Sequence, residues 1–303
     1  MIRVLLNDGL DKKAIENLTK KGFQADNIHI ADEDLGEALK DYDALVVRSA
    51  TKVRENIIRK AKDGQRLKLI IRGGVGVDNI DVKTAIELGI DVKNTPGASS
   101  ASVAELTLAH MFAVSRFIAV SNVTMREGKW EKKKYKGIEL SGKTLGLIGA
   151  GRIAKEVAVR AKALGMNVIY NDILGEKEDF KGFRYLAFDE LLKEADFVSL
   201  HIPYDKAKGA VIGEEEISIM KDGAYLINCA RGGVVDEEAL LNALNSGKIA
   251  AAGIDVYKEE PSANLELINH PNVSVTPHIG ASTKEAQERI GEEVGSILEE
   301  YFK

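Results

Sequence analysis

Short apolar runs alternate along the chain with longer stretches in which apolar residues recur at helical spacing. In the first part of the chain we expect strands at 4–6, 44–47, 67–71 and 90–92. In the second part we expect strands directly after Lys143 and at 167–170, 197–200, 225–227, 251–254 and 273–275. Strands that alternate with helical segments predict an α/β fold with parallel sheets.

Two helical segments indicate how the chain divides. Residues 101–114 are strongly apolar at helical spacing and predict a buried helix. They follow Asn94-Thr-Pro-Gly97, a turn at which we place the crossing between two domains. The last predicted helix, 282–301, is expected to return to the first domain. We therefore predict two α/β domains that flank an interdomain cleft, one of residues 1–96 plus 282–303 and the other of residues 97–281.

A glycine-rich turn, Gly149-Ala-Gly151-Arg-Ile-Ala154, follows the strand after Lys143. The next strand ends at Asp172, about 20 residues further on, which completes the pattern of a dinucleotide-binding unit. Gly149 permits the tight turn, Gly151 lets the backbone approach the pyrophosphate, and Ala154 lets the helix pack against the strand. An acid at this strand end accepts hydrogen bonds from the ribose and repels the extra phosphate of NADP, so we expect NAD as the cofactor. The domains are predicted to be Rossmann-like or flavodoxin-like, the second binding NAD and the first acting as a substrate-binding lid domain.

The composition is typical of a globular protein. Of the 303 residues, 45% are hydrophobic and 29% are charged, and the formal net charge of −5 argues against nonspecific binding to nucleic acid. No apolar run approaches the roughly 20 residues needed to cross a bilayer, and the N-terminus has no signal-peptide layout. The single cysteine, Cys229, excludes an internal disulfide, so we expect a cytoplasmic protein without membrane or nucleic-acid partners. Histidines and acids lack metal-ligand spacing, so we expect no metal.

Three residues that follow strands of the second domain have the chemistry of an acid–base site. His278 supplies a group suited to proton transfer near neutral pH. Glu260 is a candidate partner that would orient the imidazole and stabilise its protonated form, and Arg231 has a planar fork suited to a substrate carboxylate. Each residue alone has an ordinary alternative as a solvated side chain, so the hypothesis depends on their occurring together. Because ligands bind at the carboxyl ends of parallel strands, we expect the three side chains in one cleft.

Two arginines at strand ends of the first domain, Arg48 and Arg72, predict a second anion-binding region. The alternative is a pair of solvated strand-end charges. Cys229 has no base partner in the sequence, and we interpret it as a small residue packed beneath the cofactor rather than as a nucleophile. The lysine run 132–134 is interpreted as solvated chain rather than as a phosphate site.

Several separated motifs occur in the order known from one enzyme family. They are Arg48-Ser-Ala-Thr-Lys-Val, Arg72-Gly-Gly-Val-Gly-Val-Asp-Asn, Asn228-Cys-Ala-Arg-Gly-Gly-Val-Val-Asp-Glu, Asp255-Val-Tyr-Lys-Glu-Glu-Pro and Pro277-His-Ile-Gly-Ala-Ser-Thr-Lys-Glu-Ala. Through these motifs the chain resembles the D-isomer-specific 2-hydroxyacid dehydrogenases along nearly its whole length. The resemblance implies hydride transfer between NAD and a 2-hydroxy acid, with Arg231, Glu260 and His278 as the catalytic residues.

The resemblance also implies which positions contact the two ligands. The implied cofactor contacts are Val75, Gly149, Gly151, Arg152, Ile153, Asp172, Ile202, Cys229, Ala230, Arg231, Asp255, His278, Ile279, Gly280 and Ala281. The implied substrate contacts are Arg48, Ser49, Arg72, Gly73, Gly74 and Asn94. The resemblance is closest to members that oxidise D-3-phosphoglycerate, so we expect oxidation of this phosphorylated acid to 3-phosphohydroxypyruvate, the first step of L-serine biosynthesis.

Two alternatives remain open. The same chemistry on another substrate would make the chain a glyoxylate or hydroxypyruvate reductase, or a broad D-2-hydroxyacid dehydrogenase. An NAD-sensing interaction protein is a different class that shares the scaffold and the three catalytic positions. The resemblance further implies a homodimer formed through the NAD-binding domains, with the segment around Trp130 reaching across. Many family members continue into a C-terminal regulatory domain, and because this sequence stops at Lys303, regulation through that domain is not expected.

Overall fold

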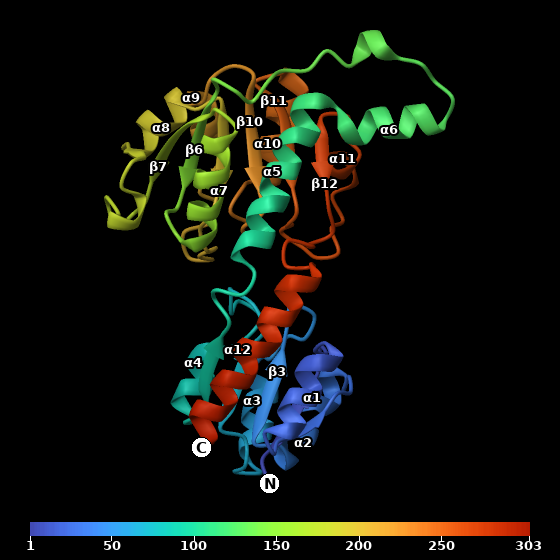
Figure 1. The fold of residues 1–303 in the computed structure, drawn as a ribbon, viewed down its shortest axis with the longest axis vertical. Coiled ribbons are helices and arrows are strands. Elements are labelled where there is room, and N and C mark those ends of the chain that lie inside the picture. Colours follow the sequence, from blue (N-terminus) through green and yellow to red (C-terminus); the bar gives the residue numbers. More distant parts are fainter. The chain divides into compact units, whose positions relative to one another are not determined.

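The computed structural model describes residues 1–303 and contains two compact units (Figure 1). The first unit consists of Met1–Ser100 and Ala281–Lys303, and the second consists of Ala101–Gly280. The boundaries expected from the sequence, after residues 96 and 281, lie close to these. Each unit has its own parallel sheet, which confirms the predicted fold class of two parallel α/β domains.

The first unit is built around a five-stranded sheet in which every neighbouring pair of strands is parallel. Its strand order, β2-β1-β3-β4-β5, is that of a flavodoxin-like sheet. In chain order its elements are β1 (Arg3–Leu6), α1 (Lys12–Lys20), β2 (Gln24–Asp26), α2 (Asp32–Ala38), η1 (Leu39–Asp41), β3 (Ala44–Val47), α3 (Glu55–Lys62), β4 (Leu69–Arg72), α4 (Val82–Glu87), β5 (Asp91–Asn94) and α12 (Lys284–Phe302).

Apolar side chains cover both faces of this sheet. Successive residues of a strand point to opposite faces, so Leu5 packs with α2 and α3, whereas Val4 and Leu6 pack with α1 and α12. Helix α12 contributes Ile290 and Val294, both fully buried. The C-terminal helix is therefore part of the core that the N-terminal strands form.

The second unit contains a seven-stranded parallel sheet of order β12-β11-β10-β9-β6-β7-β8. The order reverses between β6 and β9, as in doubly wound dinucleotide-binding folds. Its elements are α5 (Ser100–Arg116), α6 (Ile118–Arg126), η2 (Lys132–Lys134), β6 (Thr144–Ile148), α7 (Arg152–Ala163), β7 (Asn167–Asn171), η3 (Glu178–Phe180), β8 (Arg184–Tyr185), α8 (Phe188–Glu194), β9 (Phe197–Leu200), α9 (Glu214–Ile219), β10 (Ala224–Asn228), α10 (Glu237–Ser246), β11 (Ile249–Ile254), α11 (Leu265–Ile268) and β12 (Val273–Val275).

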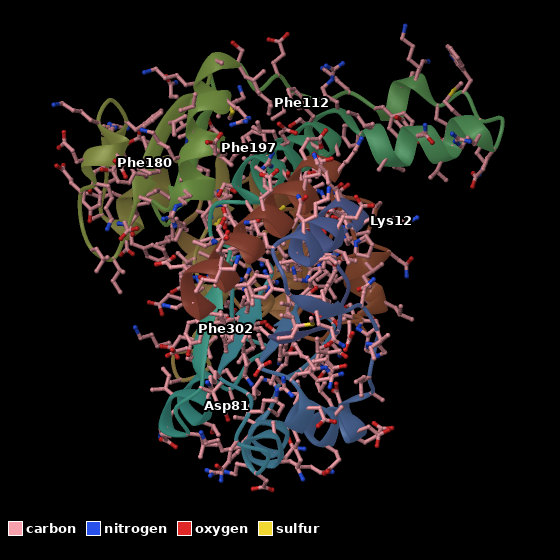
Figure 2. All side chains as sticks on the ribbon, turned by 60° about the horizontal axis from the view of Figure 1, so that its bottom comes forward. Lys12, Asp81, Phe112, Phe180, Phe197 and Phe302 are labelled. Atoms are coloured by element: carbon pink, nitrogen blue, oxygen red, sulfur yellow. The ribbon has the colours of Figure 1, made fainter.

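Two apolar clusters cover the faces of this second sheet. Helices α5 and α7 pack on one face together with Phe180 and Phe197, which are labelled in Figure 2. Helices α8, α9 and α10 pack on the other face, where Leu200 and Leu226 are buried. The strands are thus covered on both sides, and their carboxyl ends are the edge at which ligand-binding loops emerge.

Two short strands, β2 and β8, lie outside the predicted set. β2 is an edge strand made of Gln24-Ala-Asp26, and β8 is an edge strand made of Arg184-Tyr185. Edge strands are half solvated and commonly polar, so neither has the apolar run that identifies an inner strand. The predicted strand 90–92 is also shifted, because β5 is the other edge of its sheet and continues through polar residues to Asn94.

Helix α6 projects away from the sheet of the second unit (Figure 1). None of its residues is buried, and its side chains extend into open space (Figure 2). No single helix is long and apolar enough to span a bilayer, although α5 and α6 taken together, bent by 63°, have the length and apolar composition of a span. Much of that apolar character belongs to α5, which lies in the core of the unit.

Candidate active site

The glycine-rich turn between β6 and α7 leaves open space beside the backbone. Gly149 has φ +92°, and a Cβ there would lie 2.6 Å from the carbonyl oxygen of His201, so no other residue fits without strain. Gly151 has φ −88°, and a Cβ there would meet no atom within 4 Å. The first N–H groups of α7, which begins at Arg152, have no side-chain cap. This turn therefore has the room and the donors that a pyrophosphate requires.

Asp172 places a carboxylate against the same turn. Its Oδ2 accepts the N–H of Ala150 at 2.9 Å, and its Oδ1 accepts the N–H of Leu174 at 2.9 Å. Burial alone would raise the pKa of Asp172, but these hydrogen bonds and Lys177, whose Nζ is 3.5 Å from Oδ1, lower it overall. Asp172 is therefore ionised at neutral pH, and its charge is fixed against the glycine-rich turn.

His278 and Glu260 form a direct contact. Nδ1 of His278 lies 2.7 Å from Oε2 of Glu260, and Oε1 of Glu260 accepts the N–H of Tyr257 at 3.2 Å. An ionised carboxylate can only accept, so Nδ1 of His278 carries the proton and Nε2 keeps a free lone pair when the ring is neutral. The imidazole is thereby oriented to act as a base through Nε2.

Arg231 belongs to the same group of charges. It follows β10, and its Nη1 donates to the carbonyl of Ala230 at 2.6 Å. Burial by itself would raise the pKa of Glu260, but the contact with His278, the N–H of Tyr257 and the charge of Arg231 lower it overall. The structure therefore brings together all three side chains that the sequence predicts as catalytic, and their charges interact.

Asp255 holds the loop that carries His278. The carboxylate is 1% exposed, its Oδ1 accepts the N–H of Ile279 at 2.8 Å, and its Oδ2 accepts the N–H of Gly280 at 2.9 Å. The carbonyl of Asp255 accepts the N–H of His278 at 2.9 Å. His278 has φ +53°, a conformation that non-glycine residues adopt rarely and that these hydrogen bonds maintain.

Two other predicted cofactor positions are Ile202, beside the glycine-rich turn, and Cys229, directly after β10. A Cβ on Gly149 would lie 2.7 Å from Cγ2 of Ile202, so Ile202 is adjacent to the turn. Cys229 is 7% exposed, and burial with the nearby charge of Asp255 raises the pKa of its thiol to about 12. A thiol with this pKa is not a nucleophile at neutral pH, in agreement with the interpretation of Cys229 as a packing residue.

The predicted substrate positions gather within the first unit, at the carboxyl ends of β3 and β4. Asp8 accepts the N–H of Arg48 at 2.6 Å and the hydroxyl of Thr51 at 2.5 Å, which holds the loop after β3. Asn79 donates to the carbonyls of Arg48 and Thr51, both at 2.8 Å. Burial lowers the pKa of the Arg48 guanidinium and the charge of Asp8 offsets part of this, but an arginine remains a cation at neutral pH. Ser49 is exposed in this loop.

Arg72 and its two following glycines form the second part of that region. Gly74 has φ +148°, and a Cβ there would lie 1.5 Å from Nη1 of Arg72, so the guanidinium folds back over the glycine. Asn94 donates to the carbonyl of Val75 at 2.5 Å, which ties β5 to the same turn. A Cβ on Gly73 would lie 3.6 Å from Cγ of Arg48, so the two arginine loops are neighbours.

Two predicted cofactor positions, Val75 and Ala281, lie in the first unit, whereas the other thirteen lie in the second. No group of three or more His, Cys, Asp or Glu residues is arranged to hold a metal ion. Asp8, Asn79, Tyr257 and His110 are polar residues of these regions that the sequence analysis does not single out. Asp8 follows the first strand by two residues, so the strand-end rule that selects Arg48 also selects Asp8. Asn79 and Tyr257 stand inside two of the quoted motifs, whereas His110 has no signal in the sequence.

The chain matches a known family. The family model described as D-isomer specific 2-hydroxyacid dehydrogenase, NAD binding domain, matches residues 108–280. A hydroxypyruvate reductase of Thermotoga maritima is 48% identical, over 99% of this chain and 97% of that protein. A D-3-phosphoglycerate dehydrogenase of Methanocaldococcus jannaschii is 47% identical over 100% of this chain. This chain spans 57% of the length of that second relative.

A solved structure with a similar fold is also that of a dehydrogenase. The crystal structure of D-lactate dehydrogenase from Aquifex aeolicus, complexed with NAD and lactic acid, is similar to this chain with a TM-score of 0.83 and 34% identity. The similarity covers 99% of this chain and 95% of that chain. The resemblance inferred from the motifs and the prediction of NAD as the cofactor are both confirmed.

Proposed function

Because the chain belongs to the D-isomer-specific 2-hydroxyacid dehydrogenase family, we propose that it oxidises D-3-phosphoglycerate to 3-phosphohydroxypyruvate with NAD. The observation that carries the proposal is the contact of 2.7 Å between Nδ1 of His278 and Oε2 of Glu260, whose pKa the charge of Arg231 helps to lower. His278 is the base, Glu260 orients the base, and Arg231 is a cation for the substrate carboxylate. These are the groups that oxidation of a 2-hydroxy acid requires.

In the proposed mechanism, Nε2 of His278 takes the proton of the substrate hydroxyl. NAD, when bound, would supply the acceptor for the hydride on the carbon that bears this hydroxyl. Glu260 stabilises the imidazolium that forms, since its carboxylate stays ionised beside Nδ1. Arg231 binds the substrate carboxylate and favours the developing carbonyl electrostatically. In the reverse direction His278 returns the proton.

The residues that would hold NAD fit its chemistry. Gly151 leaves the space beside the N-terminus of α7 for the pyrophosphate, and Asp172 offers an ionised acceptor to the ribose. Oδ2 of Asp255 accepts the N–H of Gly280 and retains capacity for a second donor, such as a carboxamide. Ile202 and Cys229 offer apolar surface to the rings of the cofactor.

The preference for a phosphorylated substrate is proposed from the first unit. Arg48 and Arg72 are neighbouring cations on loops that Asp8, Asn79 and Asn94 hold in place. A dianionic phosphate is the ligand that such paired guanidinium groups favour. We propose that these two guanidinium groups bind the phosphate of the substrate.

The test is NADH formation with D-3-phosphoglycerate and with D-glycerate, for the wild type and for Arg48→Ala. The expected result is a kcat/KM that falls much more for the phosphorylated acid than for D-glycerate in the variant. Arg59→Ala is the matched control, because Arg59 is an exposed arginine of the same unit paired only with Glu55. Equal losses on both substrates, or a wild type that prefers D-glycerate, would reject the phosphate assignment.

A hydroxypyruvate reductase is the second candidate. The observation that favours it is the 48% identity to the Thermotoga maritima protein, with nearly complete coverage of both chains. The same residues would then return hydride and proton to an unphosphorylated 2-keto acid. NADH consumption with hydroxypyruvate and with 3-phosphohydroxypyruvate, compared by kcat/KM, separates the two candidates.

We further propose that two copies associate through the NAD-binding unit, using α6 and the loop after it. This arm exposes Trp130 at 78%, Val123 at 54% and Met125 at 53% of their surfaces, and α6 has no buried residue. An apolar arm of this kind is typical of a surface that a partner covers. Sedimentation should give a dimer for the wild type and monomers for the double variant Val123→Glu/Met125→Glu. A monomeric wild type would contradict the proposal.

A further inference from the structure

A buried histidine lies behind the loop that carries His278. His110 is on α5 and is 2% exposed. Its Nδ1 is 3.0 Å from the hydroxyl of Ser274, and its Nε2 is 3.0 Å from the hydroxyl of Thr276. The hydroxyl of Thr276 lies 2.6 Å from Oδ1 of Asp255. These contacts form a continuous chain from β12 through α5 to the carboxylate that holds the His278 loop.

The direction of each hydrogen bond in this chain follows from the number of protons available. An ionised Asp255 can only accept, so the single hydroxyl proton of Thr276 points to Oδ1. The oxygen of Thr276 must then accept from Nε2 of His110, which therefore carries a proton. In the neutral ring Nδ1 is unprotonated and accepts the hydroxyl proton of Ser274. The chain thus runs from Ser274 through His110 and Thr276 to Asp255, with every proton assigned.

This chain of hydrogen bonds ends at the backbone of the loop that carries His278, the candidate base. Asp255 accepts the N–H groups of Ile279 and Gly280, and its carbonyl accepts that of His278. Tyr257 adds a second brace, since its hydroxyl donates to the carbonyl of Thr276 at 2.9 Å. The rare backbone conformation of His278 is therefore maintained by Asp255 and Thr276, which this chain of hydrogen bonds orients.

The sheet makes room for this histidine. A Cβ on Gly253, in β11, would lie 2.6 Å from Cβ of His110. Only a glycine at this position lets α5 approach β11 closely enough for the imidazole to reach both hydroxyls. Burial lowers the pKa of His110, and the charge of Asp255 opposes this only in part, which favours the neutral ring. Asp255 is the charged group that acts on His110, and its charge also raises the pKa values of Cys229 and Tyr257.

We propose that His110 is a positioning residue for the reaction, which fixes the Thr276 hydroxyl on Asp255 and thereby the loop that presents His278. His110 touches neither substrate nor cofactor in this role and acts through Asp255. The inference rests on the proposed function of His278 as the base. A small displacement of a catalytic group lowers turnover more than it lowers ligand affinity, because the geometry of the reacting atoms is lost.

The first test needs no activity. Two-bond nitrogen–proton NMR spectra of the full chain at neutral pH should show His110 as the neutral Nε2–H tautomer. A protonated ring or an Nδ1–H tautomer at neutral pH would overturn the proposed chain. The resonance is assigned by its absence in His110→Gln.

The second test compares three variants by kcat and by KM for NAD. His110→Leu removes the donor to Thr276, and we expect kcat to fall roughly tenfold with KM for NAD unchanged. His110→Gln offers an amide N–H to the same hydroxyl, so it should recover most of kcat. Ser115→Ala is the matched control, since Ser115 is a buried hydroxyl of the same helix that bonds only to the carbonyl of Met111.

The outcomes separate the two hypotheses. Wild-type kcat in His110→Leu, or no recovery in His110→Gln, overturns the positioning role. A kcat loss in Ser115→Ala equal to that of His110→Leu overturns it as well, because the loss would then reflect helix packing. An active His278→Gln variant would instead contradict the proposed base, whatever the His110 variants do.

Discussion

Glu260 divides its carboxylate between His278 and the backbone: Oε2 lies 2.7 Å from Nδ1 of the imidazole, and Oε1 accepts the N–H of Tyr257. The hydrogen bond from Tyr257 thus holds the carboxylate in place within its own loop, and the held carboxylate orients the imidazole ring. Because the ionised acid only accepts, it selects the tautomer in which Nε2 is the base. Orientation and tautomer therefore both depend on one oxygen atom.

Replacing Glu260 by Gln should lower kcat by roughly 10²-fold or more, the usual contribution of an acid–base pair. The amide can donate to Nδ1 and so stabilise the tautomer with a protonated Nε2, which cannot accept a proton. The measurement is steady-state NADH formation, with Glu259→Gln, an exposed neighbour, as the control. The pKa of Glu260 is lowered, so its carboxylate stays ionised at pH values where an ordinary glutamate is protonated. Wild-type activity should therefore be lost through protonation of Glu260 only below the ordinary carboxyl pKa of 4.5. Wild-type kcat in Glu260→Gln would show that the contact is not used.

The two glycines of the nucleotide turn should respond differently to alanine. Gly151→Ala should leave the melting temperature unchanged, because φ is −88° and the new Cβ meets no atom within 4 Å. The same variant should raise KM for NAD, because the new methyl group fills the space proposed for the pyrophosphate. Gly149→Ala should destabilise the fold by about 1–3 kcal/mol, the cost of an unfavourable backbone conformation, with the contact to His201 added. Calorimetry and NAD titration measure both. An unchanged KM in Gly151→Ala would place the pyrophosphate elsewhere.

Asp172→Asn should weaken the preference for NAD over NADP by roughly tenfold or more, because like charges held together cost several kcal/mol. The amide oxygen can still accept the N–H of Ala150 in the glycine-rich turn, whereas the N–H of Leu174 loses its acceptor. Lys177, 3.5 Å from Oδ1, is then available to the extra phosphate, and Asp172→Asn/Lys177→Met should gain less NADP activity than the single variant. The ratio of kcat/KM for the two cofactors is the readout. A ratio unchanged by Asp172→Asn would mean that this carboxylate does not face the ribose.

Asp43→Asn should destabilise the first unit by about 1–3 kcal/mol at neutral pH, since it removes a buried charged acceptor. The carboxylate accepts the N–H of Arg3 at 2.7 Å and two guanidinium N–H groups of Arg66 at 3.1 and 3.0 Å. Burial alone would raise the pKa of Asp43, but these partners lower it overall. The stabilisation is therefore present above the ordinary carboxyl pKa of 3.8 and is lost as the pH falls through the lowered value.

Urea denaturation at neutral pH and in acid checks this, and the difference between wild type and Asp43→Asn should shrink in acid. Asp222→Asn is the matched control, because its carboxylate is 93% exposed and pairs with Lys248 at the surface. Exposed ion pairs contribute little to the free energy of unfolding, so Asp222→Asn should unfold like the wild type at both pH values. A pH-independent difference for Asp43→Asn would show that shape rather than charge is responsible.

Local patterns in the sequence were sufficient for most of the fold. Inner strands such as 44–47 and 197–200 match the structure at both ends, because buried parallel strands need short apolar runs. The edge strands Gln24–Asp26 and Arg184–Tyr185 lack apolar runs and are not recognisable in the sequence. The glycine turn and Asp172 were also recognisable, since a tight turn and a close backbone approach allow few residue types.

The sequence by itself therefore determined the alternation of strands and helices, the nucleotide turn and the type of each residue at the strand ends. Only the tertiary structure decided which oxygen of Glu260 meets His278, and that Asp8 and Asn79 hold the loop of Arg48. It also decided that His110 reaches Thr276, a residue 166 positions away. Periodicity depends on neighbours along the chain, whereas the partner of a buried polar atom depends on which segments packing brings within about 3 Å.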